Sequence, residues 1–474
     1  MTLSNHQLKQ QIDTTFQDQQ RYALELRKSD YKKRLAVLDR FEKVFRDSKE
    51  KIYLSAAKDF SKPQAEVDMS EIMAVLAELK HVRKSLKKWM KPVPVKATIS
   101  FLGTFSKIVR EPKGVTLVVS PWNYPFNLTF GPMIWSIAAG NTVIIKPSEM
   151  TPNMSAVIAE IVKEAFRPEE VSLFEGEADV ASYLTSLPFD HIFFTGSPAV
   201  GKLVMASAAK NLTSVTLELG GKSPVIVDKT ANIKKAVQSI AWGKFSNNGQ
   251  TCIAPDYLYV HESIKDKFLT EMTTCIKKQY GLDNDAKGND DYCQVVNDGH
   301  YRRISNLLAD AKDRGGHLIT GGQTDDNDRF IAPTLIEEMA EDSAIMEEEI
   351  FGPLLPVITF KELEDVIGYV NSKPKPLALY IFSSHKQSIE KILSETSAGD
   401  TCVNQTMMHF LHLNLPFGGV NNSGIGKSGG VWGFNAFSHE RSVLVDKFSS
   451  ASLLHPPYTP KVRKLIEWTI KLTT

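Results

Sequence analysis

The chain of 474 residues carries 56 Lys and Arg against 55 Asp and Glu, so its net charge is +1, and 42% of its residues are hydrophobic. This balance is typical of a globular protein with two or three domains, and it excludes a disordered chain and one that binds nucleic acid through bulk positive charge. No apolar run approaches a membrane span and the N-terminus lacks the apolar core of a signal peptide, so we expect a cytoplasmic protein whose partner is a small molecule.

The first 90 residues have the spacing of amphipathic helices, in which Leu38, Phe41 and Phe45 share one face. Residues 94–114 are rich in Pro, Gly and β-branched types, which predicts an extended excursion. From there to residue 219, short apolar segments such as GVTLVVS, NTVIIKPS and HIFFTGS alternate with helical ones. This alternation indicates βαβ units and a parallel sheet covered on both faces.

A second alternating series follows Gly220 and Gly221, which we interpret as a hinge between two lobes, and contains SPVIVDK, DYLYVHE and LALYIFSS. The last 60 residues hold a Gly-rich loop, LPFGGVNNSGIGKSGG, and an extended segment, RSVLVDKF. We expect that segment to pair with the 94–114 excursion. The sequence therefore predicts an α/β protein with two doubly wound parallel-sheet domains and a small β element.

Ligands of parallel sheets bind beyond the carboxyl ends of the strands, so the polar residues there are candidates for function. Asn123 lies in SPWNYPF and either donates to an oxyanion or bonds its own backbone in the turn. Lys146 and Glu149 follow the next strand and suit the hydroxyls of an adenosine ribose, or form a surface ion pair. A carboxylate repels a 2′-phosphate, so Glu149 favours NAD over NADP.

Two further strand ends carry candidate residues. Gly196 and Gly201 bracket the N-cap residue Ser197 in a turn that suits a pyrophosphate, although its GxxxxG spacing is also that of a capped turn without a ligand. Glu218 ends a strand, and Cys252 follows the next helix in GQTC. A thiol can form a covalent adduct while a facing carboxylate activates water, whereas a cysteine taken alone is more often a small buried apolar residue.

Seven motifs occur in the order SPWNYPF, KPSE, FTGS, LELGGKSP, GQTC, EEIFGP and LPFGGV, and through them nearly the whole chain resembles the NAD(P)-dependent aldehyde dehydrogenases. GQTCIAPDY and FSHERSVL look most like the class 3 branch. The resemblance implies NAD as cofactor, with NADP as an alternative, a homodimer, and no metal. It implies oxidation of medium-chain aliphatic or aromatic aldehydes to carboxylic acids through a cysteine thiohemiacetal and thioester.

The resemblance also implies a role for individual residues and ranges. Cys252 is implied as the nucleophile, Glu218 as the general base, and Asn123 with the Cys252 N–H as the oxyanion hole. The implied cofactor residues are Trp122, Lys146, Ser148, Glu149, Gly196, Ser197, Gly201, Leu219, Glu349 and Phe351, and the implied substrate pocket contains Tyr124, Trp242, Thr251, His409 and Phe417. The implied divisions are a cofactor-binding domain of residues 1–93 and 115–219, a catalytic domain of 220–414, a bridging or oligomerisation element of 94–114 and 415–452, and a C-terminal tail of 453–474.

Two other functions remain open from the sequence. In an acylating dehydrogenase, coenzyme A or phosphate takes the acyl group from Cys252, and Glu218 argues against this because water needs a base whereas a thiol does not. In a non-catalytic binding or structural protein on the same fold, Cys252, Glu218 and Asn123 would have no reason to occur together. His409 and His412 lack a carboxylate or cysteine partner in sequence, so they predict no metal site.

Overall fold

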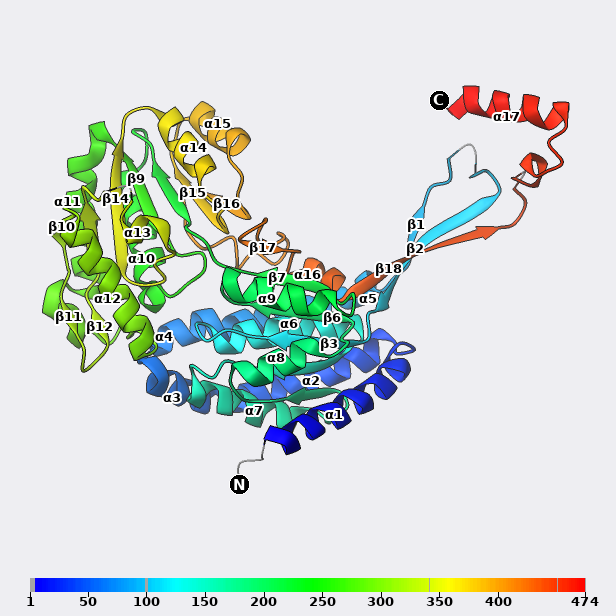
Figure 1. The fold of residues 1–474 in the computed structure, drawn as a ribbon, viewed down its shortest axis with the longest axis horizontal. Helices are drawn as coiled ribbons and strands as arrows, with labels where there is room; N and C mark the ends of the chain where they lie inside the picture. The colour runs from blue at the N-terminus through cyan, green and yellow to red at the C-terminus, as the bar shows by residue number, and fades with distance from the viewer. Residues whose placement is uncertain (1–4, 99–100, 341, 450, 474) are drawn as a thin grey trace.

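The computed structural model describes residues 5–98, 101–340, 342–449 and 451–473, and the other positions in the predicted ranges lie outside it. Two α/β lobes lie side by side, and a narrow β arm extends from them (Figure 1). The strand orders are β17-β7-β6-β3-β4-β5 in the first lobe, β10-β13-β14-β9-β8-β15-β16 in the second and β1-β2-β18 in the arm, with a separate β11-β12 pair. This arrangement confirms the predicted α/β class.

The N-terminal helices pack on both sides of the first lobe: α2, α3 and α5 share one core with α6, whereas α1 belongs to the core on the other face of the sheet. The predicted face is buried, and the Phe41 ring lies 4.8 Å from that of Phe130 on the central helix α6. Asp30 caps α2 by accepting from the Lys33 N–H at 2.9 Å. These helices are α1 (Asn5–Leu26), α2 (Tyr31–Asp47), α3 (Lys49–Phe60), α4 (Gln64–Val67), η1 (Asp68–Ile72) and α5 (Met73–Trp89).

The first lobe is built on a parallel sheet with helices on both faces, as the sequence predicts. Neighbouring residues of one strand belong to opposite cores: Val118 packs with α2 and α6, whereas Leu117 packs with α1. The elements are β3 (Val115–Val119), α6 (Pro125–Ala139), β4 (Thr142–Lys146), α7 (Pro152–Ala165), β5 (Val171–Leu173), α8 (Ala178–Ser186), β6 (His191–Thr195), α9 (Pro198–Ala209) and β7 (Ser214–Glu218), with β17 (Gly424–Ile425) added antiparallel to β7.

The second lobe repeats this plan, and it too has one antiparallel edge strand, β10, which pairs with β13. Its strands are β8 (Pro224–Val227), β9 (Tyr257–His261), β10 (His317–Thr320), β13 (Thr334–Glu337), β14 (Leu354–Phe360), β15 (Ala378–Phe382) and β16 (Asp400–Val403). Its helices are α10 (Ile233–Phe245), α11 (Lys265–Tyr280), α12 (Asp298–Asp313), α13 (Ala344–Glu347), α14 (Leu363–Ser372) and α15 (Lys386–Glu395). Short elements complete it: η3 (Ser246–Gly249), η4 (Glu262–Ile264), η5 (Asp283–Gly288), β11 (Thr324–Asp325) and β12 (Phe330–Ile331).

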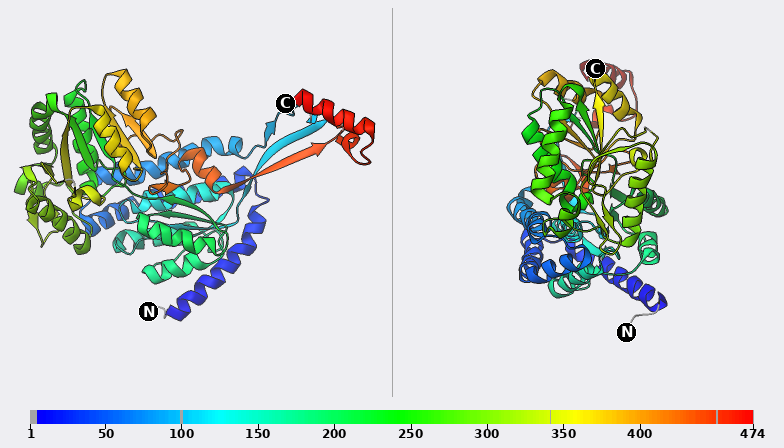
Figure 2. Two further views of the ribbon diagram at one scale, coloured as in Figure 1. Left: turned by 45° about the horizontal axis from the view of Figure 1, so that its top comes forward. Right: turned by 90° about the vertical axis from the view of Figure 1, so that its left-hand side faces the viewer.

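The arm confirms the predicted pairing of the excursion with the C-terminal extended segment. β2 (Thr104–Pro112) and β18 (Ser438–Asp446) pair antiparallel over their whole lengths, and β1 (Val93–Val95) adds to β2. Figure 1 and the left-hand view of Figure 2 show α17 (Pro460–Thr473) at the far end of the arm. None of the helices in the described ranges combines the length and apolarity that a membrane crossing requires. The remaining elements here are α16 (Gly430–Ala436) and η6 (Ala451–Leu454).

Candidate active site

The loop that carries Cys252 has an unusual backbone that its sequence explains. Asn247, Asn248 and Gly249 all have positive φ, at 53°, 56° and 71°, and Asn and Gly are the residues that adopt this conformation most readily. A Cβ on Gly249 would lie 2.4 Å from the Gly352 carbonyl oxygen, so a side chain does not fit there. The NNG sequence therefore sets a tight turn that delivers Cys252, which is partly exposed, to the junction of the lobes.

Asn123 lies against this loop. Its side-chain Nδ2 donates to the Gln250 carbonyl at 3.0 Å, and the hydroxyls of Tyr124 and Thr251 lie 2.7 Å apart. These two contacts attach the end of β3 to the residues that precede Cys252. The side chain of Asn123 thus bonds the opposite lobe, and among the described residues it does not form the bond to its own backbone that was one interpretation of the sequence.

Glu218 ends β7 and is almost fully buried. Its Oε1 accepts from the Ser428 hydroxyl at 2.8 Å, whereas Oε2 has no hydrogen-bond partner among the residues that the structure describes. Burial first, and Asp400 after it, raise the pKa of the carboxyl to about 8 against the opposing effects of Ser428 and Lys427. The group is therefore a carboxyl with one oxygen available to a proton and a pKa near neutrality.

The Cys252 thiol shares its surroundings with two carboxyls. Burial raises its pKa above the ordinary value, and Glu349 and then Glu218 raise it further. Both carboxyls therefore lie near enough to act electrostatically on the sulfur. A thiol in this environment ionises readily only when positive charge is placed beside it.

The predicted ribose and pyrophosphate residues lie at the ends of β4 and β6. Lys146 is buried and its Nζ donates to Glu149 Oε2 at 2.5 Å, while Glu149 is 41% exposed. At the start of α9, Ser197 Oγ accepts from the Val200 N–H at 3.4 Å. A Cβ on Gly201 would lie 2.7 Å from Leu219, which explains the close approach of α9 to the end of β7. Ser148 and Gly196 lie in the same two turns, and a Cβ on Gly196 would lie 2.6 Å from the Phe194 ring.

The loop with Glu349 and Phe351 is held firmly at the same junction. Arg303 donates to the carbonyls of Glu349 and Ile350 at 3.1 and 2.7 Å. Glu349 is buried with a pKa raised to about 8, first by burial, and in the described part of the chain its Oε1 has no hydrogen-bond partner. The Phe351 ring lies edge-on to Trp122, at 5.4 Å between centroids. A buried carboxyl oxygen without a partner indicates a polar ligand.

Comparison with known proteins agrees with this geometry. The family model described as "Aldehyde dehydrogenase family" matches residues 4–443. The chain belongs to the aldehyde dehydrogenase family. A relative from Staphylococcus aureus named 4,4'-diaponeurosporen-aldehyde dehydrogenase is 42% identical over 94% of this chain and 95% of its own, and the dimeric NADP-preferring aldehyde dehydrogenase of Rattus norvegicus is 40% identical over 91% and 94%. The solved substrate-bound state of Staphylococcus aureus AldH matches with a TM-score of 0.92 and 40% identity, over 97% of this chain and 99% of that one.

The comparison confirms the resemblance seen in the sequence, including its class 3 character, and makes this aldehyde dehydrogenase an NAD(P)-dependent oxidoreductase. The residues present fit that cofactor. The glycine turn into α9 leaves backbone N–H groups at a helix start, and Glu349 keeps a buried carboxylate oxygen unpaired within the described residues. The individual assignments of cofactor residues stay predictions.

The implied substrate residues of the aldehyde dehydrogenase divide into two groups. Cys252 packs against a buried cluster that includes Phe417, and the His409 ring stacks on Phe417 at 5.9 Å between centroids. Burial lowers the pKa of His409 to about 4, so its ring is neutral at physiological pH, and its Nδ1 lies 3.1 Å from Cys402 Sγ. The second group precedes Cys252 in the chain. It consists of Tyr124 and Thr251, whose hydroxyls bond each other, and of Trp242, a partly exposed residue of α10.

Several residues that complete the site were not identified from the sequence. Ser428 contacts Glu218 from the Gly-rich loop, and Lys222 donates to the Ile345 and Glu348 carbonyls at 2.8 Å each while pairing with Asp256. Lys222 and Asp256 lie within the motifs LELGGKSP and GQTCIAPDY, but the sequence did not predict that the two residues form an ion pair. Arg303 lies on an ordinary amphipathic helix, and no signal in the sequence marks it.

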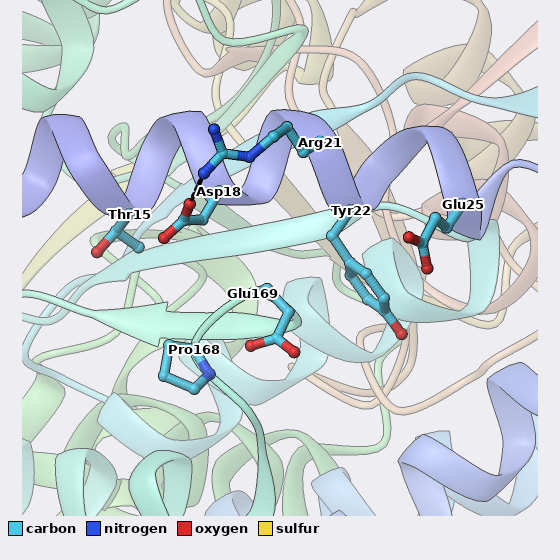
Figure 3. A pocket seen from close by; sticks show the side chains of 7 residues that line it. All are labelled: Thr15, Asp18, Arg21, Tyr22, Glu25, Pro168 and Glu169. Atoms are coloured by element: carbon cyan, nitrogen blue, oxygen red, sulfur yellow. Dashed lines mark hydrogen bonds and ion pairs between the residues drawn. The ribbon is translucent and has the colours of Figure 1, made fainter.

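A separate surface hollow lies between α1 and the turn before β5 (Figure 3). It shares no residue with the site above. Tyr22 at its edge accepts from Arg167 at 2.7 Å, and the guanidinium lies 5.1 Å from the Tyr22 ring. The hollow is lined by Thr15, Asp18, Arg21, Tyr22, Glu25, Pro168 and Glu169.

Proposed function

We propose that this aldehyde dehydrogenase oxidises apolar aldehydes to carboxylic acids, with Cys252 as the nucleophile and water as the final acyl acceptor. One observation carries the proposal. Glu218 has an unpaired buried carboxylate oxygen in the described structure, and its partner Ser428 also bonds Phe417, which belongs to the cluster that Cys252 packs against. A carboxyl so placed can take a proton from water beside an acyl group on the sulfur.

Cys252 forms the covalent adduct with the aldehyde. Its surroundings raise the thiol pKa, so attack on the aldehyde carbonyl requires nearby positive charge. NAD(P), when bound, supplies that charge and accepts the hydride. Glu349, Phe351 and Trp122 would hold its nicotinamide end, and the ends of β4 and β6 its adenosine and pyrophosphate.

Asn123 supports the oxyanion that forms when the sulfur attacks. Its Nδ2 carries two hydrogens, and the Gln250 carbonyl accepts one of them at 3.0 Å. The second hydrogen is available to a substrate oxygen, together with the Cys252 N–H. Loss of one such donor typically raises the barrier by about 3 to 4 kcal/mol.

Glu218 acts as the general base in the release of the acid. After hydride transfer, water attacks the thioester on Cys252 and gives a proton to Glu218, and the carbon–sulfur bond breaks to release the acid and a thiolate. The thiolate recovers its proton from Glu218, which returns to the base form. An acyl transfer to coenzyme A or phosphate would not need this base. The buried carboxyl therefore favours hydrolysis over the acylating alternative.

The surroundings of the nucleophile Cys252 are apolar, and they indicate the substrate class. Met407, Phe410 and Cys252 all pack against the buried cluster that contains Phe417 and Tyr380. An apolar wall of this kind suits aliphatic chains and aromatic rings.

Cofactor choice and assembly follow from the same comparisons. We propose that both NAD and NADP are used, because Glu149 is exposed enough to turn aside from a 2′-phosphate and the rat relative is named NADP-preferring. We propose a homodimer, because the same relative is named dimeric and the arm exposes Phe105, Leu444 and Phe448.

The decisive experiment follows cofactor reduction at 340 nm with aliphatic aldehydes of increasing length and with benzaldehyde, using each cofactor. We expect kcat/KM to rise with chain length and Cys252→Ala to abolish it. A preference for short, charged aldehydes would reject the proposed substrate class. Stimulation of turnover by coenzyme A or phosphate, with no free acid formed, would reject hydrolysis.

A further inference from the structure

Lys62 is a buried lysine behind the candidate oxyanion asparagine, and the mechanism above gives it no role. Helix α3 ends at Phe60, and Ser61 takes a left-handed conformation with φ of 54° that turns the chain inward. Lys62 is consequently only 2% exposed, and its side chain is completely covered. A lysine is rarely buried to this extent unless its charge is paired and used.

The ammonium group pairs with Glu71, lies 5.8 Å from the centre of the Phe60 ring, and reaches the segment that carries Asn123. Lys62 Nζ lies 3.3 Å from Glu71 Oε1, 3.4 Å from the Asn123 carbonyl oxygen and 4.0 Å from the centre of the Tyr124 ring. The carbonyl contact bears on the peptide plane of Asn123, and the ring contact adds a cation–π attraction to the next residue. One cation thus touches two successive residues of the SPWNYPF turn.

Glu71, the ion-pair partner of Lys62, also contacts the start of α6, directly after the same turn. Its Oε2 accepts from the Asn127 N–H at 2.9 Å, in the first turn of α6. These N–H groups have no partner within their helix, and in the described structure the side chain of the preceding residue, Tyr124, does not cap them. The carboxylate from a distant segment therefore replaces the missing cap and fixes where α6 begins.

The nucleophile loop is tied to this cluster as well. Asn247 Nδ2 donates to the Asn123 carbonyl at 3.1 Å and to the Gln250 carbonyl at 3.1 Å, and the Asn247 N–H donates to Glu66 Oε2 at 2.9 Å. The Asn123 carbonyl thus receives both Lys62 and Asn247. The Asn123 side chain donates to the same Gln250 carbonyl as Asn247, so one connected network fixes both the backbone and the side chain of Asn123.

We propose that Lys62, paired with Glu71, is a positioning residue that sets the orientation of Asn123 and thereby of its oxyanion donor. It acts through Asn123 and touches no reacting atom. The inference rests on the proposed role of Asn123. Because such donors act by being oriented in advance, a displaced donor slows the chemical step and leaves the binding of aldehyde and cofactor nearly unchanged.

The test compares Lys62→Met with Asn123→Ala and with the double variant. We expect Lys62→Met to slow the pre-steady-state burst of cofactor reduction by about 10- to 100-fold, less than loss of the donor itself, with KM for the aldehyde and Kd for NAD changed less than about threefold. Combined with Asn123→Ala, Lys62→Met should slow the burst less than about threefold further, because its effect passes through the missing amide. Lys62→Arg keeps the cation and should recover part of the rate.

Two controls separate positioning from damage to the fold. Lys51→Met removes a lysine from the exposed pair with Glu160 and should leave the burst unchanged. Lys62→Met/Glu71→Gln removes both buried charges together, and it replaces Lys62→Met in the comparison if that single variant does not fold.

The outcomes are distinguishable. If Asn123→Ala is slow but Lys62→Met is as fast as the unaltered enzyme, the positioning role is overturned and the proposed function stands. The same conclusion follows if the Lys62→Met loss is undiminished in the Asn123→Ala background. If Asn123→Ala itself keeps the full burst, the oxyanion role of Asn123 is rejected and the positioning role with it.

Discussion

The proposed role of Glu218 as the general base, together with its raised pKa, predicts that the hydrolytic half of the reaction depends on pH. A buried carboxyl keeps its proton to a higher pH than an exposed one, so the base form of Glu218 increases as pH rises. With a pKa of about 8, roughly a tenth of these carboxyls are ionised at pH 7 and roughly nine tenths at pH 9. Hydrolysis of the thioester is therefore expected to accelerate about tenfold over this interval.

Two variants test the assignment to Glu218. Glu218→Gln should keep the burst of cofactor reduction but lose steady-state turnover and its rise with pH. Ser428→Ala removes the hydroxyl that stabilises the ionised carboxyl, so it should move the midpoint upward by about one pH unit. Ser423→Ala is the matched control, because its hydroxyl bonds Val420 in the same loop.

The assay is rapid mixing at 340 nm from pH 6.5 to 9.5, which separates the burst from the steady state. The separation matters because the thiol of Cys252 also has a raised pKa and affects the burst. A steady-state rate that stays flat with pH while thioester accumulates would refute the reasoning. Full turnover by Glu218→Gln would refute it as well.

Three further predictions follow from single positions. Cys252→Ala should abolish oxidation, while Cys275→Ala, which removes a thiol from the surface of α11, should leave kcat/KM unchanged. Glu149→Gln removes the charge opposite a 2′-phosphate and should raise kcat/KM with NADP relative to NAD severalfold; an unchanged ratio would contradict this. Gly249→Ala places a methyl group 2.4 Å from a carbonyl oxygen at φ of 71°, so thermal unfolding should show a loss of about 1 to 3 kcal/mol, whereas Gly288→Ala, with open space around it, should be neutral.

The elements and the strand ends were predictable because their signals are local. The strands β3, β4, β6, β8, β9, β14 and β15 are short apolar runs, so most of both sheets could be inferred from neighbouring residues, whereas β16 has the sequence DTCV and lacks this signal. Cys252, Glu218 and Asn123 follow strands or helices of this series, and the carboxyl edge of a parallel sheet gathers such residues. The prediction that these three residues lie close together therefore required no knowledge of long-range contacts.

The supporting residues were not predictable because their partners lie far along the chain. Ser428 reaches Glu218 from the Gly-rich loop, and Lys62 reaches Asn123 from the end of α3. Nothing in the local pattern distinguishes Lys62 from an exposed lysine, since its burial depends on the left-handed turn at Ser61 and on the packing of α6. Side-chain networks of this kind are set by tertiary structure and leave little trace in periodicity.

The pairing of β2 with β18 joins Thr104 to Asp446 and Pro112 to Ser438. Likewise β17 places Gly424 opposite Glu218. During synthesis, β2 and the outer side of β7 emerge from the ribosome hundreds of codons before the strands that cover them. Both must wait as open edges, which are the parts of a nascent chain most prone to pair with a neighbour, and a chaperone that recognises extended segments has its longest opportunity there.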